Sequence, residues 1–245
     1  MRLVTRRRLK WALVLVLAAA IIGYALWQVG RARCFQLVGE ITCRVQTSQK
    51  LVALSFDDGP TPQGVAALLP VLREHGARAT FFLIGQEMER HPGLARRLAA
   101  AGHEIANHSY AHDRMLGLFP GAYAEELERT NRLLRAEGVN GLLLFRPPYG
   151  KKLTGLPIAV ERAGLRMITW DVEDPPGSVS DPAAYADHIM RGVRPGSIIL
   201  MHPMYASGRT AREALPLILT RLRAAGYRVV TVRELLEVEA REEAG

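Results

Sequence analysis

The stretch LVALSFDDGP, residues 51–60, joins an uninterrupted apolar run to two adjacent carboxylates and a Gly-Pro pair. Such a run is typical of a strand that is buried on both faces, and Asp-Gly-Pro is typical of a turn. Two neighbouring carboxylates repel each other, and burying either one without a partner is costly. The simplest interpretation of Asp57 and Asp58 is therefore a solvated turn, unless the rest of the chain gives the pair a purpose.

Apolar, β-rich runs and helical patterns alternate from this point onward. Strands are expected at Leu51–Phe56, Ala79–Ile84, His103–Ala106, Leu142–Phe145, Arg166–Val172, Ser197–Met201 and Tyr227–Val232. Helices are expected at Pro62–Glu74, Pro92–Ala101, Tyr123–Glu137, Leu156–Ala163, Pro182–Val193, Ala211–Ala225 and Arg233–Arg241. Nearly continuous apolar strands between helices predict a parallel α/β sheet covered by helices. Seven such units favour a closed or nearly closed, distorted (β/α)7-type barrel.

The positive charge of the chain is concentrated at its N-terminus. Residues 1–10 hold five of the 32 basic residues and no acid, and the other 27 nearly balance the 24 acidic residues. No basic stripe interleaved with aromatic residues is seen, so nucleic acid is not expected as a partner. Trp11–Val29 follows as 19 residues without a charge. At 1.5 Å per residue a helix of that length spans roughly 28 Å, close to a hydrocarbon core of about 30 Å.

The basic segment before this run predicts a cytoplasmic N-terminus and an exported body. A cleaved signal peptide is the alternative to an uncleaved signal anchor. The apolar run is longer than the usual h-region of about 7–15 residues, and Gly30 and Ala32 offer only a weak cleavage site. We therefore expect a cytoplasmic segment 1–10, a transmembrane anchor 11–29, a linker 30–50, a catalytic domain 51–236 and a charged tail 237–245. The protein would be single-pass in the cytoplasmic membrane, and its oligomeric state stays open.

The two cysteines of the chain, Cys34 and Cys43, both lie just beyond this anchor. In an exported protein two nearby cysteines can pair, and CFQLVGEITC is typical of a short hairpin that turns at Gly39. Two free buried thiols are the alternative. A disulfide is favoured, and two cysteines alone give no zinc-ribbon pattern.

If the sheet closes into a barrel, its chemistry belongs at the carboxyl ends of the strands. Ionisable residues do follow the expected strands. They occur in SFDDGP, residues 55–60, ANHSYAH, residues 106–112, FRPPYG, residues 145–150, WDVEDPP, residues 170–176, and LMHP, residues 200–203. These residues are therefore expected to collect at one rim although they are far apart in sequence.

His108 and His112 are spaced so that one helical turn would point both imidazoles the same way. With Asp58 they would form a three-ligand set for one divalent metal with an open position. The adjacent aspartates then have a purpose, because one can bind the cation while the other faces the water that the cation acidifies. Arg146 can hold that second carboxylate through a bidentate bond, or it can make a purely structural ion pair. His202 can protonate a leaving group, or it can be an ordinary core histidine.

At this point the sequence resembles the polysaccharide deacetylases of the NodB-homology type, over about residues 50–236. SFDDGP resembles the first motif of that family, HSYAH its metal-binding histidine motif, RPPY its Arg-x-Pro-aromatic motif and LMH its Leu-x-His motif. TFFLIG and GHEIANHS resemble the usual surroundings of these motifs. The resemblance implies a distorted β/α barrel and the metal-dependent removal of N- or O-acetyl groups from a glycan.

The resemblance also implies a role for each matching residue. Asp57 would be the general base, Arg146 would orient it, and His202 would be the general acid. Asp58, His108 and His112 would bind the metal, and the backbone N–H of Tyr149 would help to bind the oxyanion. Zinc is the expected metal, and one carboxylate with two imidazoles also suits cobalt, nickel or manganese.

One family motif departs from the pattern, because the Asp-Trp pair that supports the acid histidine is missing. Trp170 is followed by DVEDPPG, and no further Trp occurs. Asp171, Glu173 and Asp174 are the nearest replacements, of which Glu173 or Asp174 lie nearer the rim. The expected substrate is N-acetylated cell-envelope polysaccharide, either peptidoglycan or exopolysaccharide. The alternatives are a glycan-binding module with a degraded site and an amidohydrolase that acts on a non-polysaccharide amide or a lipid-linked sugar.

Overall fold

The computed structural model describes residues 2–243, and it describes side chains for residues 7–242. The strands are β1 Leu51–Asp57, β2 Thr80–Leu83, β3 Glu104–Asn107, β4 Leu144–Phe145, β5 Arg166–Met167, β6 Ile198–Met201 and β7 Arg228–Val230. The helices are α1 Arg2–Arg31, α2 Pro62–Glu74, α3 Gly85–Arg90, α4 Leu94–Ala100, α5 Ala124–Ala136, α6 Gly155–Arg162, α7 Pro182–Gly192, α8 Arg209–Ala224 and α9 Val232–Glu243. Three short 3-10 turns lie at Pro120–Ala122, Pro148–Gly150 and Ala206–Gly208.

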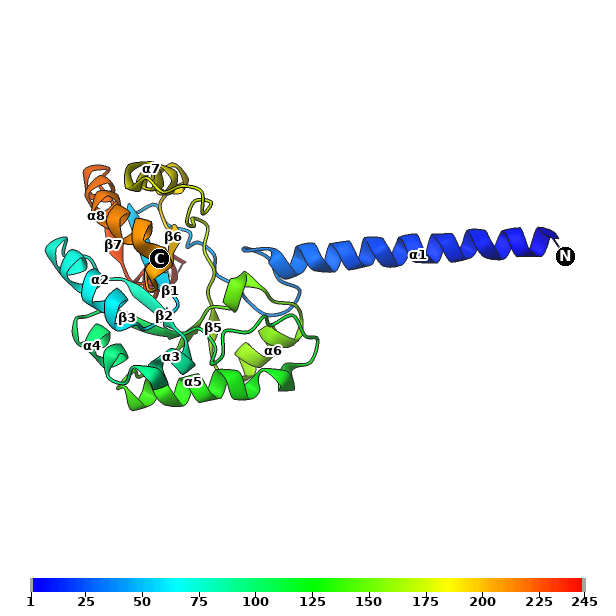
Figure 1. Ribbon diagram of the computed structural model, residues 1–245, viewed down its shortest axis with the longest axis horizontal. Helices are drawn as coiled ribbons and strands as arrows, with labels where there is room; N and C mark the ends of the chain where they lie inside the picture. The colour runs from blue at the N-terminus through cyan, green and yellow to red at the C-terminus, as the bar shows by residue number, and fades with distance from the viewer. Residues whose placement is uncertain (1, 244–245) are drawn as a thin grey trace.

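The strands form one parallel sheet of seven strands in the order β5-β4-β3-β2-β1-β6, with β7 also paired to β1. β1 is buried along its whole length because β6 lies along one side of it, and β7 and then β2 follow each other along the other. Helices cover the outer face of this sheet (Figure 1). The alternation of apolar strands and helices therefore predicted the parallel α/β sheet correctly.

The sheet is a half-barrel rather than a closed barrel. No ladder joins β5 to β6 among the described residues, and the two edges meet only where Val172 bridges Ile199. The remaining gap is filled by the chain that follows α1. Thr42 pairs with Ile168 beyond β5, and Arg44 pairs with Ser197 just before β6. The closed form of the expected barrel is therefore wrong, because a segment from outside the repeating β/α units occupies the place between these strands.

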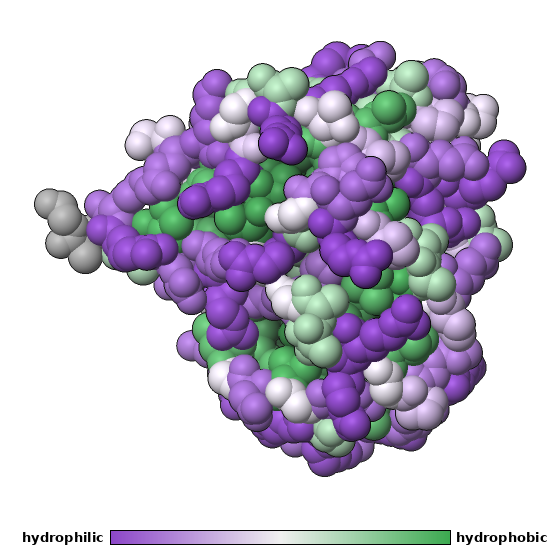
Figure 2. Space-filling model, turned by 90° about the vertical axis from the view of Figure 1, so that its left-hand side faces the viewer, coloured by the Kyte–Doolittle hydropathy of each residue, from purple (hydrophilic) through white to green (hydrophobic). Residues whose placement is uncertain are grey.

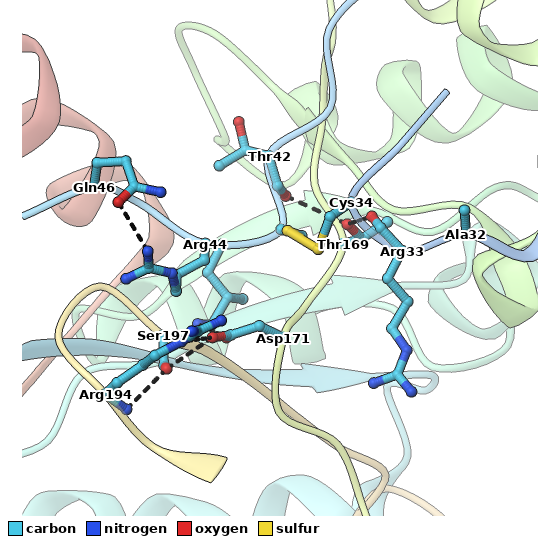
Figure 3. The surroundings of a disulfide bond; sticks show 12 residues. Ala32, Arg33, Cys34, Thr42, Arg44, Gln46, Thr169, Asp171, Arg194 and Ser197 are labelled. Carbon is cyan, nitrogen blue, oxygen red and sulfur yellow. Dashed lines mark hydrogen bonds and ion pairs between the residues drawn. A yellow bond between two sulfur atoms is a disulfide. The ribbon is translucent and has the colours of Figure 1, made fainter. Parts of the chain in front are cut away.

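Residues 30–50 consequently do not form the expected hairpin. The chain does turn at Gly39, where φ is +69°, but its backbone then pairs with the edges of the sheet and not with itself. The expected disulfide between Cys34 and Cys43 is present. It lies beside Thr169, Asp171 and Ser197, so it holds this segment against the gap in the sheet (Figure 3).

The final helix, expected to end at Arg241, takes in the expected charged tail from residue 237 as far as the structure describes it. α9 continues to Glu243, and Leu235, Leu236 and Val238 are buried on its inner face. Its acidic face is tied to the segment before β1, since Glu239 accepts a hydrogen bond from the backbone N–H of Gln46 at 3.0 Å. Residues 244 and 245 lie outside the described residues.

The N-terminal helix α1 stands apart from this body and projects away from it (Figure 1). Its segment Arg7–Arg31 is 25 residues long and contains an 18-residue window with a mean hydropathy of 2.2, none of which is buried within the structure. A helix of this length and composition is able to cross a membrane, and a signal sequence has the same properties. The face of the body opposite to α1 is mainly hydrophilic, with small apolar areas between the polar side chains (Figure 2).

Candidate active site at the carboxyl ends of the strands

Asp57, the last residue of β1, forms a buried ion pair with Arg146, which directly follows β4. The Arg146 Nη1 donates to Asp57 Oδ1 at 2.6 Å, and the two side chains are 0% and 3% exposed. Burial raises the pKa of Asp57, but the charge and hydrogen bond of Arg146 and the charge of His202 outweigh it and leave that pKa below its usual value. Asp57 is therefore ionised at neutral pH, as an acceptor of protons has to be.

The guanidinium of Arg146 is fixed on several sides. Its Nη2 donates to the carbonyl oxygen of Thr169 at 3.0 Å. Its Cζ lies 4.0 Å from the centre of the Phe82 ring and 5.5 Å from that of Trp170. The packing of Trp170, which is 7% exposed, thus closes the space around the ion pair. This arrangement fixes the direction in which the Asp57 carboxylate can point.

Asp58, His108 and His112 bring three metal-ligating atoms together, all within 4.8 Å of one another. Asp58 Oδ1 lies 3.8 Å from His108 Nε2 and 3.3 Å from His112 Nε2. This oxygen is buried and has no hydrogen-bond partner within the described part of the chain. An unpaired buried carboxylate oxygen facing two imidazoles is what a cation site requires, and the three residues therefore fit a divalent metal.

The tautomer of His108 suits this use. Its Nδ1 lies 2.8 Å from the carbonyl oxygen of Arg146, which can only accept a hydrogen bond. Nδ1 therefore carries the proton, and the lone pair of Nε2 faces the other ligands, as is usual for metal-binding histidines. Burial lowers the pKa of His112, which also favours the neutral form that a metal ligand needs.

The two histidines converge without the helical turn that their spacing suggested. The segment after β3 is an irregular loop in which Ser109 and His112 have φ of 65° and 61°. Its side chains and backbone are bonded to one another and to α5. Asn107 Nδ2 donates to Asn131 Oδ1 at 2.8 Å, and the Glu126 carboxylate accepts from two backbone N–H groups of the loop. The expectation of a helix here is therefore wrong, although the ligands do converge.

His202, which follows β6, has a carboxylate partner of its own. Its ring Nδ1 lies 2.6 Å from Asp174 Oδ2, and the same oxygen accepts from the His202 backbone N–H at 3.1 Å. The hydroxyl of Tyr185, on α7, donates to the other oxygen of Asp174. Burial alone would lower the pKa of His202, but the Asp174 hydrogen bond and the nearby charges of Asp57 and Asp58 raise it to about 9.

Of the three carboxylates considered as partners of His202, only Asp174 contacts it. Asp171 accepts from Ser197 Oγ and from the backbone N–H of Ile198, both at 2.9 Å. Glu173 accepts from the indole N–H of Trp170 at 2.8 Å. The side chain that sequence reasoning missed is Tyr185, because a tyrosine inside an amphipathic helix has the pattern of an ordinary core residue.

Tyr149 lies beside the histidines in the turn Pro148–Gly150, where its own φ is 57°. Its side chain is 54% exposed, and its ring centre lies 4.8 Å from that of His112. The neighbouring Gly150 leaves room for the Trp170 ring, since a Cβ there would lie 2.9 Å from a ring carbon. All seven site residues expected from the sequence thus occur at one end of the sheet.

Comparison with protein families places the chain in a known class. Residues 44–168 match the model of the polysaccharide deacetylase family. A peptidoglycan-N-acetylglucosamine deacetylase from Bacillus cereus is 33% identical over 205 residues, which are 81% of this chain and 93% of that protein. A chitooligosaccharide deacetylase from Azorhizobium caulinodans is 32% identical over 160 residues, which are 65% of this chain and 76% of that protein.

Other relatives are longer than this chain. The peptidoglycan-N-acetylmuramic acid deacetylase PdaC of Bacillus subtilis is 31% identical over 204 residues, which are 82% of this chain and 42% of that protein. The chain belongs to the polysaccharide deacetylase family. It is a carbohydrate deacetylase, a hydrolase acting on carbon–nitrogen bonds other than peptide bonds.

Solved structures show the same fold. A family 4 acetyl xylan esterase from Clostridium thermocellum, in complex with a cobalt ion, is 32% identical with a TM-score of 0.70, over 77% of this chain and 91% of that one. A CE4 family pseudoenzyme from Bacillus anthracis is 29% identical with a TM-score of 0.74, over 82% of this chain and 70% of that one. A mutant of this pseudoenzyme has restored enzymatic activity.

Proposed function

We propose that this chain is a membrane-anchored, metal-dependent deacetylase that removes acetyl groups from N-acetylated cell-envelope polysaccharide, with peptidoglycan as the first candidate. The observation that carries the proposal is the meeting, at one rim, of three ligand atoms, an ionised carboxylate and a histidine–carboxylate pair. The relatives named above act on peptidoglycan and on chitooligosaccharides. Substrates of both kinds contain N-acetylated amino sugars.

The proposed reaction uses each group at one step. A divalent cation, zinc or else cobalt, nickel or manganese, would be held by Asp58, His108 and His112 and would polarise the acetyl carbonyl and acidify water. Asp57 accepts a proton from the attacking water, and Arg146 keeps that carboxylate ionised and oriented. The new C–O bond forms as the backbone N–H of Tyr149 donates a hydrogen bond to the developing oxyanion.

His202 completes the reaction. As imidazolium it gives its proton to the sugar nitrogen while the C–N bond breaks, so that acetate and a free amine leave. Asp174 supports this role because it stabilises the imidazolium form. The contact between His202 and Asp174 also argues against a degraded site, since the partner of the acid histidine is present in another position of the sequence.

The location of the reaction follows from the N-terminus. Five basic residues in 1–10 precede a helix long and apolar enough to cross a membrane. By the positive-inside rule the N-terminus stays in the cytoplasm and the catalytic body lies outside it. Mass spectrometry of the mature N-terminus tests this: an intact N-terminus is expected, and a start near Arg33 would mean that the helix is a cleaved signal.

The activity is tested by acetate release from a panel of purified substrates, together with analysis of the bound metal. The full chain should release acetate from peptidoglycan or an N-acetylated exopolysaccharide and should lose this activity on chelation. Release from small non-glycan amides alone would support the rival amidohydrolase. Metal binding and glycan binding without acetate release from any substrate would support a glycan-binding module.

A further inference from the structure

The C-terminal end of α1 is bonded directly to the catalytic rim. The backbone N–H of Lys152 donates to the carbonyl oxygen of Gly30 at 3.0 Å, and Lys152 Nζ donates to the carbonyl oxygen of Ala32. Thr169 Oγ1 donates to the carbonyl oxygen of Arg33 at 2.5 Å. Lys152 is 1% exposed. Since Lys152 and Thr169 follow β4 and β5, no free linker separates the helix from the end of the sheet that carries the active site.

Exposed apolar side chains gather around this junction. Outside α1, the described large hydrophobic side chains that stand exposed are Phe35, Leu37, Leu116, Leu118, Phe119, Leu142, Tyr149, Tyr205 and Leu217. Six of these nine lie just after α1, in the loop 113–122, or in the turn that leads to Lys152. Phe119 is the most exposed of them at 78%, followed by Leu118 at 56%. Single exposed apolar residues are ordinary, whereas a cluster indicates a contact surface.

The loop 113–122 touches the helix end and is held there. A Cβ on Gly30 would lie 3.2 Å from Leu116 Cδ2, so the loop packs against the last turn of α1. The backbone N–H of Gly155, at the start of α6, donates to the carbonyl oxygen of Gly117 at 3.2 Å. Figure 1 shows α6 on the side of the body from which α1 projects. The side chains of Leu118 and Phe119 therefore stand out from a supported backbone beside the helix.

Three cations accompany these apolar residues. Burial and the charges of Arg31 and Arg114 lower the pKa of Lys151, as is expected for three cations close together. Arg31 lies 4.6 Å from the ring centre of Trp27, and Arg114 lies 5.2 Å from that of Tyr149. None of the three cations forms an ion pair with an acidic side chain between residues 7 and 242. Unpaired cations beside exposed apolar and aromatic groups are the arrangement that binds phosphate headgroups at a membrane surface.

We propose that loop 113–122 inserts Leu118 and Phe119 into the headgroup layer of the membrane that α1 spans, while Arg31, Arg114 and Lys151 bind lipid phosphates. This proposal rests on the membrane anchor of the proposed function. It holds the catalytic rim at the outer surface of the bilayer, so the enzyme acts on glycan strands that lie against the membrane. The partner of this surface is a bilayer with anionic headgroups, because the surface adjoins the membrane helix α1 and carries positive charge.

Spin labelling of the full chain in lipid nanodiscs tests the proposal. Since the native cysteines are paired, a label can be attached singly through Leu118→Cys, Phe119→Cys or Leu142→Cys. Leu142 is the matched control, being 49% exposed and lying just before β4, at the end of the sheet away from the active site. Each variant should keep the thermal unfolding midpoint of the wild type. Labels at 118 and 119 should be several-fold more accessible to oxygen, relative to a water-soluble nickel complex, than the label at 142.

A label on Val16→Cys, within α1, separates this proposal from the anchor itself. If the label at 16 is in the bilayer while those at 118 and 119 are as accessible to nickel as the label at 142, the surface proposal is wrong and the anchor stands. If the label at 16 is in water, the anchor fails first and the surface proposal fails with it. If a soluble glycan in detergent, but not lipid, shields the label at 119 from the nickel complex, the loop binds sugar and the proposal is overturned.

The cations are tested with Arg114→Gln combined with Lys151→Gln. The label at 118 should lie deeper in nanodiscs that contain phosphatidylglycerol than in nanodiscs of phosphatidylcholine alone. In the double variant the depth of the label should be the same in both kinds of nanodisc. An unchanged difference would contradict the assignment of lipid phosphates to these side chains.

Discussion

The Nδ1 atom of His202 lies 2.6 Å from a carboxylate oxygen of Asp174, a residue 28 positions earlier in the chain. Asp174 lies in the segment that follows β5, and His202 directly follows β6. A charge-assisted hydrogen bond of this length stabilises the protonated ring. The pair therefore fixes both the direction of the imidazole and the pH range in which it can act as an acid.

Asp174→Asn should move the alkaline limb of the pH–rate profile to lower pH. With Asp174 in place the pKa of His202 is raised to about 9, so imidazolium is present below that pH and is lost as the pH rises through it. Without the carboxylate the pKa should fall toward the ordinary value of about 6.5. Steady-state rates over this pH range measure the shift. Glu173→Gln is the control, because Glu173 bonds to Trp170, and an unchanged limb in Asp174→Asn would remove Asp174 from this role.

Arg146→Met should destabilise the protein by about 3–5 kcal/mol, because it leaves the Asp57 carboxylate buried without its partner. Urea unfolding of the metal-free protein measures the effect. Arg132→Met is a control on an exposed pair, since Arg132 lies 3.0 Å from Glu125 and the two side chains are 55% and 77% exposed, and exposed pairs contribute about 0–1 kcal/mol. If both variants lose the same free energy of unfolding, the buried pair stabilises the fold no more than an exposed pair does. Asp57→Asn together with Arg146→Met should cost less than the sum of the single changes.

Asp58→Ala, His108→Ala and His112→Ala should each lower the affinity for a divalent metal. Each variant removes one of three ligand atoms that converge within 4.8 Å, whereas His188→Ala changes a histidine on α7 that is outside the cluster. Metal content after dialysis against limiting metal separates the variants. Affinity should also fall as the pH is lowered, because protons compete for the imidazoles. Full stoichiometry at wild-type affinity in two of the three variants would refute the ligand set.

Cys34→Ser combined with Cys43→Ser should destabilise the body by roughly 2–3 kcal/mol, the chain-entropy value for a disulfide that closes a short loop. The two cysteines are nine residues apart in sequence. The loss is measured by comparing unfolding of the oxidised wild type with that of the variant. If the two unfold alike, the backbone pairing of Thr42 with Ile168 alone is enough to hold this segment.

The sequence predicted where the strands lie, because each falls in an apolar run bounded by Gly, Pro or charged residues, but β4 and β5 are only two residues long and shorter than expected. It also predicted that the site residues would meet, since the carboxyl ends of parallel strands lie at the same end of a sheet. The short helix α3, Gly85–Arg90, was missed. It begins where the Gly85 backbone N–H bonds to the carbonyl oxygen of Ser109, and a long-range contact of this kind leaves no local pattern.

The remaining errors have the same origin. The spacing of His108 and His112 suggested a helical turn, but bonds from Asn107 and Glu126 hold the loop in another conformation. The chain from residue 237 was expected to be a charged tail, yet Gln46 and Thr47 bond to two of its glutamates from the segment before β1. In each case the deciding partner lies far away in the chain or on another element, where periodicity gives no information.

The most direct test of the proposed mechanism is acetate release by Asp57→Asn with its metal content measured in the same preparation. Asparagine keeps the shape of the side chain but cannot accept the proton, so the account predicts a folded, metal-loaded protein whose turnover falls on the order of 10²–10⁴-fold. Near-normal acetate release from the metal-replete Asp57→Asn protein would contradict the account.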